Sequence, residues 1–316
     1  MPKRGRSNSL RSSNAFRRPA RRAHNSAPIV NTAAPNGSRR STTEHYGWVG
    51  GYGQGGDATG DGNAQGFNYG FGGTSFGIDR RIDSDLVVGM AGGYAGSHVR
   101  TDTGLQSAKV DSLQSGLYFS KSFGRGYFFG VGSYGHDMYD TTRLLPANIT
   151  ARGEYSGNQF STYFERGTTR SFGRWNLQPF ANLQYILLQQ DGFTETGAGG
   201  AGLTVGSTVN NSLRPGMGLR LARPMIVGGV MVVPDLHARY AYEMLDVDRL
   251  VTANFSGAVG GSFLAGGNQL GRHFGQYGVG LNAAFTRRFG GYLGYDAVTA
   301  DRTVSHTGSG GLQLAW

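Results

Sequence analysis

Apolar and polar residues alternate along most of the chain after residue 45. In residues 230–243, apolar side chains at every second position alternate with ionisable ones, namely Asp235, His237, Arg239 and Glu243. Successive side chains of a β-strand point to opposite sides of its sheet, so this pattern predicts a strand with one apolar and one ionisable face. No stretch after residue 45 shows the spacing i, i+3, i+4, i+7 of an amphipathic helix. The pattern therefore predicts an all-β fold.

The same alternation predicts about twelve strands, separated by glycine-containing turns. We expect strands in residues 46–53, 64–80, 85–100, 105–123, 125–141, 150–170, 174–191, 207–222, 228–246, 271–288, 290–301 and 304–316. Two glycine-rich connections, 192–206 and 247–270, are expected to be long loops.

Strand length favours a membrane protein over a soluble one. Several predicted strands have about 12–20 residues, whereas strands of soluble proteins usually have about 5–6 and a tilted membrane strand needs about 9–11. A sheet in lipid must close on itself so that all its backbone amides are paired. We therefore predict a closed antiparallel transmembrane β-barrel of about 12 strands. A soluble sandwich or barrel would show the same alternation with its apolar face inside, so alternation alone leaves that alternative open.

Composition supports strands joined by tight turns. The 316 residues include 55 glycines, 16 tyrosines, 18 phenylalanines and 3 tryptophans. Glycine is therefore far above its average of about 7%, and a chain rich in aromatic residues does not resemble a disordered one. Cysteine is absent, which excludes disulfides and thiolate metal ligands.

The net charge of +10 is concentrated at the N-terminus. Residues 1–44 hold ten Lys or Arg residues and one acidic residue, Glu44, whereas residues 45–316 hold twenty basic and nineteen acidic residues. We expect residues 1–44 to be a disordered basic arm and residues 45–316 to form the barrel. The barrel is nearly neutral, so we expect no nucleic-acid partner.

The N-terminus has no recognisable export signal. No apolar stretch of 7–15 residues follows its basic residues, and no segment has about 18 consecutive apolar residues. The sequence thus predicts no transmembrane helix. It also leaves two alternatives, that the chain is not exported or that Met1 is not the true start.

Residues 66–100 resemble the early hairpin of the autotransporter β-domain. They contain a glycine-rich strand that ends in Gly77-Ile78-Asp79, followed by a second strand with Gly93-Tyr94. Further features of that family recur in order, at Leu177-Gln178-Pro179, Phe193-Thr194-Glu195, Pro234, Tyr242-Glu243, Gly280-Leu281, Tyr295-Asp296, His306, Gly311-Leu312 and Trp316. The resemblance covers about residues 45–316 and rests on the ordered set.

The resemblance implies an outer-membrane translocator of type V secretion, which moves or displays an N-terminal passenger at the cell surface. Its implied partners are outer-membrane lipid, the barrel assembly machinery and a passenger segment. The apolar C-terminal residues resemble the signal that this machinery reads, and here they are Leu312, Leu314 and Trp316. The alternative is a passenger-less outer-membrane pore or surface structural protein.

The chain departs from the family pattern before the barrel. Only 44 residues precede it, where the family places a signal peptide and a long passenger. The family also threads a helix through the pore before the first strand, and here Pro28, Pro35 and Gly37 argue against an unbroken helix.

The polar strand faces are expected to line the lumen and to act sterically and electrostatically. The lumen-facing candidates are Gln184, Asp235, His237, Arg239, Glu243 and Asp296. The run of charged residues at 79–85 is most simply a solvated turn.

Three short motifs could also indicate a nucleotide site, a hydrolase or a calcium loop. Residues 51–56 satisfy G-x-G-x-x-G but lack the following helix that a dinucleotide site needs. Residues 73–77 satisfy G-x-S-x-G around Ser75, but inside a predicted strand, so a hydrolase is a weak hypothesis. Residues 57–68 begin like a calcium loop but end in Asn68 instead of glutamate. We therefore predict no catalytic residue, no cofactor and no metal.

Overall fold

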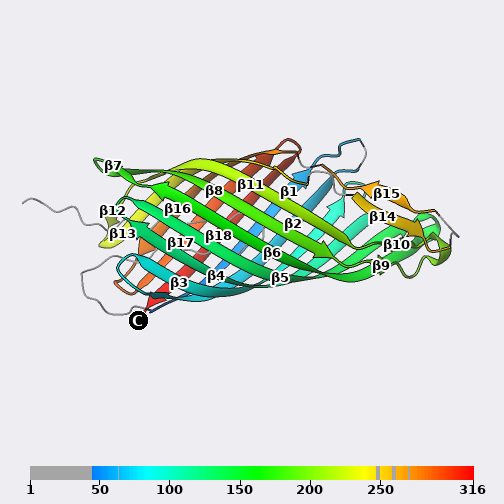
Figure 1. The fold of residues 1–316 in the computed structure, drawn as a ribbon, viewed down its shortest axis with the longest axis horizontal. Coiled ribbons are helices and arrows are strands. Elements are labelled where there is room, and N and C mark those ends of the chain that lie inside the picture. Colours follow the sequence, from blue (N-terminus) through cyan, green and yellow to red (C-terminus); the bar gives the residue numbers. More distant parts are fainter. Residues whose placement is uncertain (1–44, 63, 247–249, 258–260, 270) are drawn as a thin grey trace, which may run out of the picture.

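The twelve longest strands close into a barrel in the computed structural model, which describes residues 45–316 except 63, 247–249, 258–260 and 270 (Figure 1). The predicted arm, 1–44, lies outside the described residues. The barrel strands are β1 (His45–Ala58), β2 (Phe67–Arg81), β3 (Leu86–Thr101), β4 (Gln106–Phe123), β5 (Gly126–Leu145), β6 (Ile149–Thr168), β8 (Trp175–Gln190), β11 (Thr208–Ala222), β13 (Val230–Tyr242), β16 (His273–Ala284), β17 (Phe289–Ala300) and β18 (Thr303–Ala315).

Each barrel strand pairs with the next in antiparallel register, and β1 pairs with β18 to close the ring. The closing pair runs from Tyr46 opposite Ala315 to Ala58 opposite Thr303. Two three-residue strands, β7 (Arg170–Phe172) and β12 (Met225–Val227), extend hairpins at one end by pairing with β8 and β13. The predicted all-β barrel of about 12 strands is thus confirmed. No helix in the described part of the chain has the length and apolar character to cross a membrane.

The end of the barrel that holds His45 and Trp316 has short turns. Gly228 and Gly229 join β12 to β13 with φ of 58° and 82°, and a two-residue hairpin turn with both φ angles positive suits glycine. In the turn between β2 and β3, the Asp83 carboxylate accepts backbone hydrogen bonds from Asp85 and Leu86. These bonds hold the pKa of Asp83 below its ordinary value.

The opposite end carries a separate four-stranded sheet, which we call the loop sheet (Figure 1). It consists of β9 (Phe193–Thr194), β10 (Leu203–Val205), β14 (Leu250–Phe255) and β15 (Phe263–Gly266), in the order β15-β14-β10-β9. The two segments predicted to be long loops therefore contain strands. Each strand has only two to six residues, which is too short for an alternating pattern to stand out.

Candidate functional site

Contacts between strands that are not neighbours identify the inside of the barrel. The Trp48 indole on β1 donates a hydrogen bond of 2.8 Å to the Tyr118 hydroxyl on β4. The Arg239 guanidinium on β13 lies 5.9 Å from the ring centre of Tyr163 on β6. Two or more strands separate the members of each pair along the sheet, so these side chains meet across the interior. The buried face of the sheet is therefore the inner face.

The outer face is apolar. Large hydrophobic side chains stay exposed on nearly every barrel strand, including Leu117 on β4 (66% exposed) and Leu293 on β17 (64%). Such an extended apolar surface is unfavourable in water and suits the hydrocarbon of a bilayer. A soluble barrel would show the reverse arrangement, so the alternative left open by the sequence does not fit this structure.

Three of the six lumen-facing candidates lie together on the inner face. His237 Nδ1 lies 3.1 Å from Asp235 Oδ1 on the same strand, and His237 Nε2 lies 2.6 Å from Asp296 Oδ1 on β17. The side chain of Gln276 on β16 also donates to Asp296 Oδ1, at 3.0 Å. Each polar group thus has a partner in an environment with little water, which lowers the cost of burying it.

A glycine makes the contact between His237 and Asp296 possible. The two residues lie on β13 and β17, and Gly278 on β16 is the register partner of both. A Cβ atom on Gly278 would lie 2.3 Å from His237 Nε2 and 2.3 Å from Asp296 Oδ1. Any larger residue would therefore separate the histidine from the carboxylate.

Glu243 is buried just beyond β13 and joins two strands. Its carboxylate accepts hydrogen bonds from Arg214 Nε at 2.7 Å and from the backbone N–H of Leu213 at 3.0 Å. The Arg214 guanidinium in turn lies 4.1 Å from the ring centre of Phe274. The sequence did not single out Arg214, although its place on the polar face of residues 207–222 was a usable signal.

The last two candidates, Gln184 and Arg239, line one interior pocket. The pocket is small, and its other lining residues are Arg214, Ala241, Phe274, Gln276 and Val298. All six candidates thus lie among buried or partly buried side chains of the inner face. Their role in lining a passage stays a prediction.

Buried tyrosines hold two further carboxylates, which sequence reasoning missed. Tyr118 donates to Asp79 at 2.9 Å, and both Tyr127 and Tyr163 donate to Glu165, at 2.7 and 2.6 Å. Asp79 was expected in a solvated turn, but β2 continues to Arg81 and directs the Asp79 side chain inward. That expectation is wrong because the strand pairs with β3 for two residues beyond Asp79.

The predicted assembly signal lies on the outer face at the short-turn end. Leu312, Leu314 and Trp316 are all exposed. The Trp316 backbone exchanges hydrogen bonds of 3.0 and 3.2 Å with His45, and the two rings stack 6.3 Å apart. These residues are therefore available to another molecule or to lipid.

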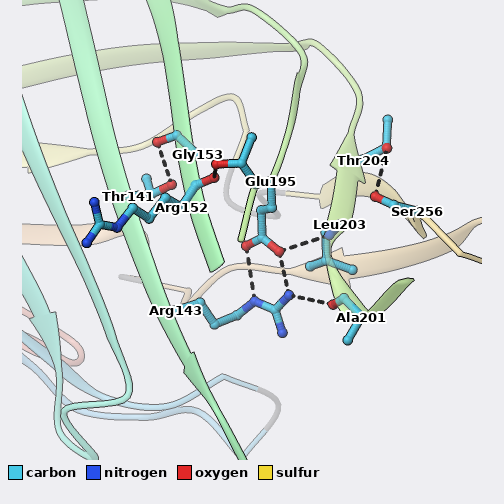
Figure 2. Close-up of polar contacts among 10 residues, drawn as sticks. Thr141, Arg143, Arg152, Gly153, Glu195, Ala201, Leu203, Thr204 and Ser256 are labelled. Carbon is cyan, nitrogen blue, oxygen red and sulfur yellow. Dashed lines mark hydrogen bonds and ion pairs between the residues drawn. The ribbon is translucent and has the colours of Figure 1, made fainter. Parts of the chain in front are cut away.

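The loop sheet is fastened to the barrel by an arginine on β5. As Figure 2 shows, the Arg143 guanidinium contacts Glu195 through two hydrogen bonds, of 3.1 and 2.5 Å, and the carbonyl oxygen of Ala201 through a third, of 3.1 Å. Glu195 also accepts the backbone N–H of Leu203 at the start of β10. The pair of Arg143 and Glu195 thus links the barrel wall to the start of β10 and to the connection between β9 and β10.

The short motifs with alternative readings lie in strands or turns. Residues 51–56 belong to β1 and residues 73–77 to β2, so no helix or strand-to-helix turn follows either motif. Ser75 is 1% exposed. In the described part of the chain, no three His, Cys, Asp or Glu residues are grouped as metal ligands. Asp61, in the calcium-like segment, accepts the backbone N–H groups of Ala64 and Gln269.

Comparison with known proteins gives one family. The model of the autotransporter β-domain family matches residues 47–296. A probable autotransporter of Escherichia coli K12, YpjA, is 28% identical over 256 residues, which are 79% of this chain and 15% of that protein. An extracellular serine protease of Serratia marcescens is 30% identical over 158 residues, or 49% of this chain and 15% of the protease. The chain thus spans about 15% of the length of these curated relatives.

A solved structure with the same architecture is the translocator domain of the autotransporter NalP from Neisseria meningitidis. It superposes with a TM-score of 0.70 over 88% of this chain and 89% of that domain, at 19% identity. This likeness shows the fold.

Proposed function

Because this chain belongs to the autotransporter β-domain family, we propose that its barrel carries an N-terminal passenger across the outer membrane to the cell surface. The barrel itself is an outer-membrane protein of type V secretion. The observation that supports a passage most directly is the division of the sheet into an apolar outer face and a polar inner face that encloses a lumen. The passenger is part of the proposal, since the chain spans only a fraction of its relatives.

In this proposal the interior residues act by shape and charge and not by catalysis. Gln184, Asp235, His237, Arg239, Glu243 and Asp296 line the passage. Hydrogen bonds of His237 with Asp296, and of Glu243 with Arg214, pair some of the ionisable groups on this wall. Residues 45–316 form the barrel in this proposal.

The C-terminal residues support assembly in the same proposal. Leu312, Leu314 and Trp316 point outward from the final strand, beside the seam where β18 meets β1. An apolar edge in this position suits recognition by the barrel assembly machinery and subsequent contact with outer-membrane lipid.

Surface exposure of the N-terminus tests the proposal. The full 316-residue chain, with an epitope at its N-terminus and a signal peptide supplied, would be expressed in a Gram-negative host. We expect an antibody to stain intact cells, with staining lost after protease treatment of intact cells. A matched chain with the epitope in the short turn at residue 286 reports the periplasmic side and should stain only permeabilised cells.

The opposite result would separate the two functions that the sequence leaves open. An N-terminal epitope that reacts only after permeabilisation, in a barrel that is assembled and heat-modifiable, would contradict translocation. Single-channel recordings of the chain with and without residues 1–44 would then distinguish a pore from a structural barrel, because a pore conducts in both forms.

A further inference from the structure

One arginine of the interior pocket, Arg239, lacks hydrogen-bond acceptors for two of its nitrogens, although the Glu165 carboxylate attracts it electrostatically. Its Nε and Nη2 atoms are buried without a hydrogen-bond partner. Its contact with the Tyr163 ring supplies a weak electrostatic attraction but no hydrogen-bond acceptor. A buried guanidinium in this state is costly, and an acceptor bound from outside would remove that cost.

A second side chain with unused polar groups lies beside it. Both Nδ2 and Oδ1 of Asn182 on β8 are buried and lack partners. Leaving such groups unpaired costs stability, and here two residues on different strands share this property. Both residues can therefore offer hydrogen-bonding groups to the same ligand.

Gly216 shows that the two side chains converge on one place. It lies on β11, between the strands that carry Asn182 and Arg239. A Cβ atom on Gly216 would lie 2.8 Å from Asn182 Oδ1 and 3.1 Å from Arg239 Nε. Because Gly216 has no side chain, the Asn182 amide and the Arg239 guanidinium can both pack over its Cα and approach each other.

The surroundings favour an anion. Arg214 lines the same pocket, although Glu243 compensates its charge. The nearby carboxylate of Glu165 accepts hydrogen bonds from Tyr127 and Tyr163 and attracts Arg239 from a distance. A guanidinium offers parallel N–H groups that match the two oxygens of a carboxylate, and an asparagine amide adds a third donor.

We propose that Arg239 and Asn182 form a carboxylate-binding site on the lumen wall. The carboxylate takes hydrogen bonds from Arg239 Nε and Nη2 and from Asn182 Nδ2. Its source is either a small organic acid that enters the lumen or an acidic side chain of a polypeptide within it. The site does not depend on secretion, so its failure and the failure of the proposed function are separable.

Nuclear magnetic resonance of arginine side chains tests the site directly. The full chain, labelled with ¹⁵N at arginine Nε and refolded in detergent micelles, would be titrated with sodium acetate and, at equal ionic strength, with sodium chloride. We expect one Nε–H resonance to shift saturably with acetate and not with chloride. That resonance should be missing from Arg239→Lys.

Two variants keep the test decisive if Arg239→Lys does not fold. Asn182→Ala should weaken acetate binding by about tenfold or more, because one hydrogen bond to a charged group is lost. The control variant Arg288→Gln removes a guanidinium from an exposed turn and should leave the acetate affinity unchanged. Equal acetate affinity of the unmodified chain, Asn182→Ala and Arg288→Gln would overturn the proposal.

The source of the carboxylate is decided with two blocked tripeptides, one with aspartate and one with asparagine at its centre. Binding of acetate alone identifies a site for small acids, whereas binding of the aspartate peptide alone identifies a site for polypeptide side chains. Binding of both supports a carboxylate site open to either source. Equal binding of the asparagine peptide, or a saturable shift with none of the probes, overturns the assignment.

Discussion

The two walls of the barrel hold their buried carboxylates in different ways. On the wall formed by β1–β6, neutral tyrosine hydroxyls bind Asp79 and Glu165 beside a cluster of buried aromatic residues. On the wall formed by β8–β17, cationic or ionisable groups bind the carboxylates, as Arg214 binds Glu243 and His237 binds Asp296. Tyrosine hydroxyls beside an aromatic cluster thus characterise the first wall, and arginine and histidine side chains beside carboxylates characterise the second.

The two walls should therefore lose stability through different kinds of substitution. Packed aromatic groups lose contact area and leave a cavity when they are truncated. A charge pair responds to the loss of one partner, because the remaining ion stays buried without compensation. Arg239 connects the two walls across the interior, since it belongs to the charged wall and contacts Tyr163 of the aromatic one.

The packing of the first wall is tested most severely by Trp48→Ala. Trp48 is buried against Tyr118 and donates a hydrogen bond to it, so we expect a loss of about 3–5 kcal/mol in the free energy of unfolding. Urea unfolding in micelles measures this loss. The matched variant is Trp175→Ala, because Trp175 is half-exposed at the start of β8. An equal loss of unfolding free energy in both variants would show that the buried cluster does not stabilise the barrel more than an exposed tryptophan does.

The lipid-facing surface common to both walls is tested by Leu183→Arg. Leu183 points outward near the middle of β8, and an arginine at mid-membrane costs about 2–4 kcal/mol. We expect reduced assembly, measured as the heat-modifiable fraction in the outer membrane. The same substitution at the exposed Leu264 of the loop sheet should be tolerated. Normal assembly of Leu183→Arg would contradict the assignment of inner and outer faces.

The charge pairing of the second wall is tested by Glu243→Gln. Glutamine keeps the shape and can still accept hydrogen bonds, but it leaves Arg214 without a counter-charge. Because the Arg214 side chain is 13% exposed, we expect a loss of about 2 kcal/mol in unfolding free energy, below the range for fully buried pairs. Glu154→Gln on the exposed face of β6 is the control. Equal stability of both variants would mean that the pair contributes nothing.

Alternation predicted the barrel because it is a property of single strands. Asp235, His237 and Arg239 follow one another at every second position, so their shared face could be inferred without knowing any neighbour. The same information cannot tell which strands pair in which register. The contact between His237 and Asp296 depends on Gly278 of a third strand, and no local pattern marks that glycine among 55.

The features that sequence reasoning missed depend on distant partners. Asp79 resembled part of a solvated charged turn, and the Tyr118 hydroxyl that binds it comes from a strand two places away along the sheet. The loop sheet likewise joins segments from two separate connections, as β10 pairs with β14. A strand of three residues gains stability only from such a partner, so its own sequence carries little signal.

The smallest expected effect concerns the junction between barrel and loop sheet, through Arg143→Gln. The substitution removes the charged contact of β5 with Glu195 (Figure 2). Since the pair is partly exposed, we expect a local cost of about 1 kcal/mol, which raises the opening equilibrium of the loop sheet about fivefold. Hydrogen exchange should therefore quicken at Leu203 and Val205, which pair within that sheet, and stay unchanged in the centre of β5.

Arg152→Gln is the matched control for this last prediction. Arg152 lies on the adjacent strand β6 and contacts Thr196 through its backbone alone, with an exposed side chain. If exchange in the loop sheet quickened equally in both variants, general loss of positive charge would explain the effect. If it quickened only in Arg143→Gln, the salt bridge would be the fastening. Quickened exchange throughout β5 would instead mean that the junction stabilises the aromatic wall itself, which would extend that wall's packing beyond the membrane.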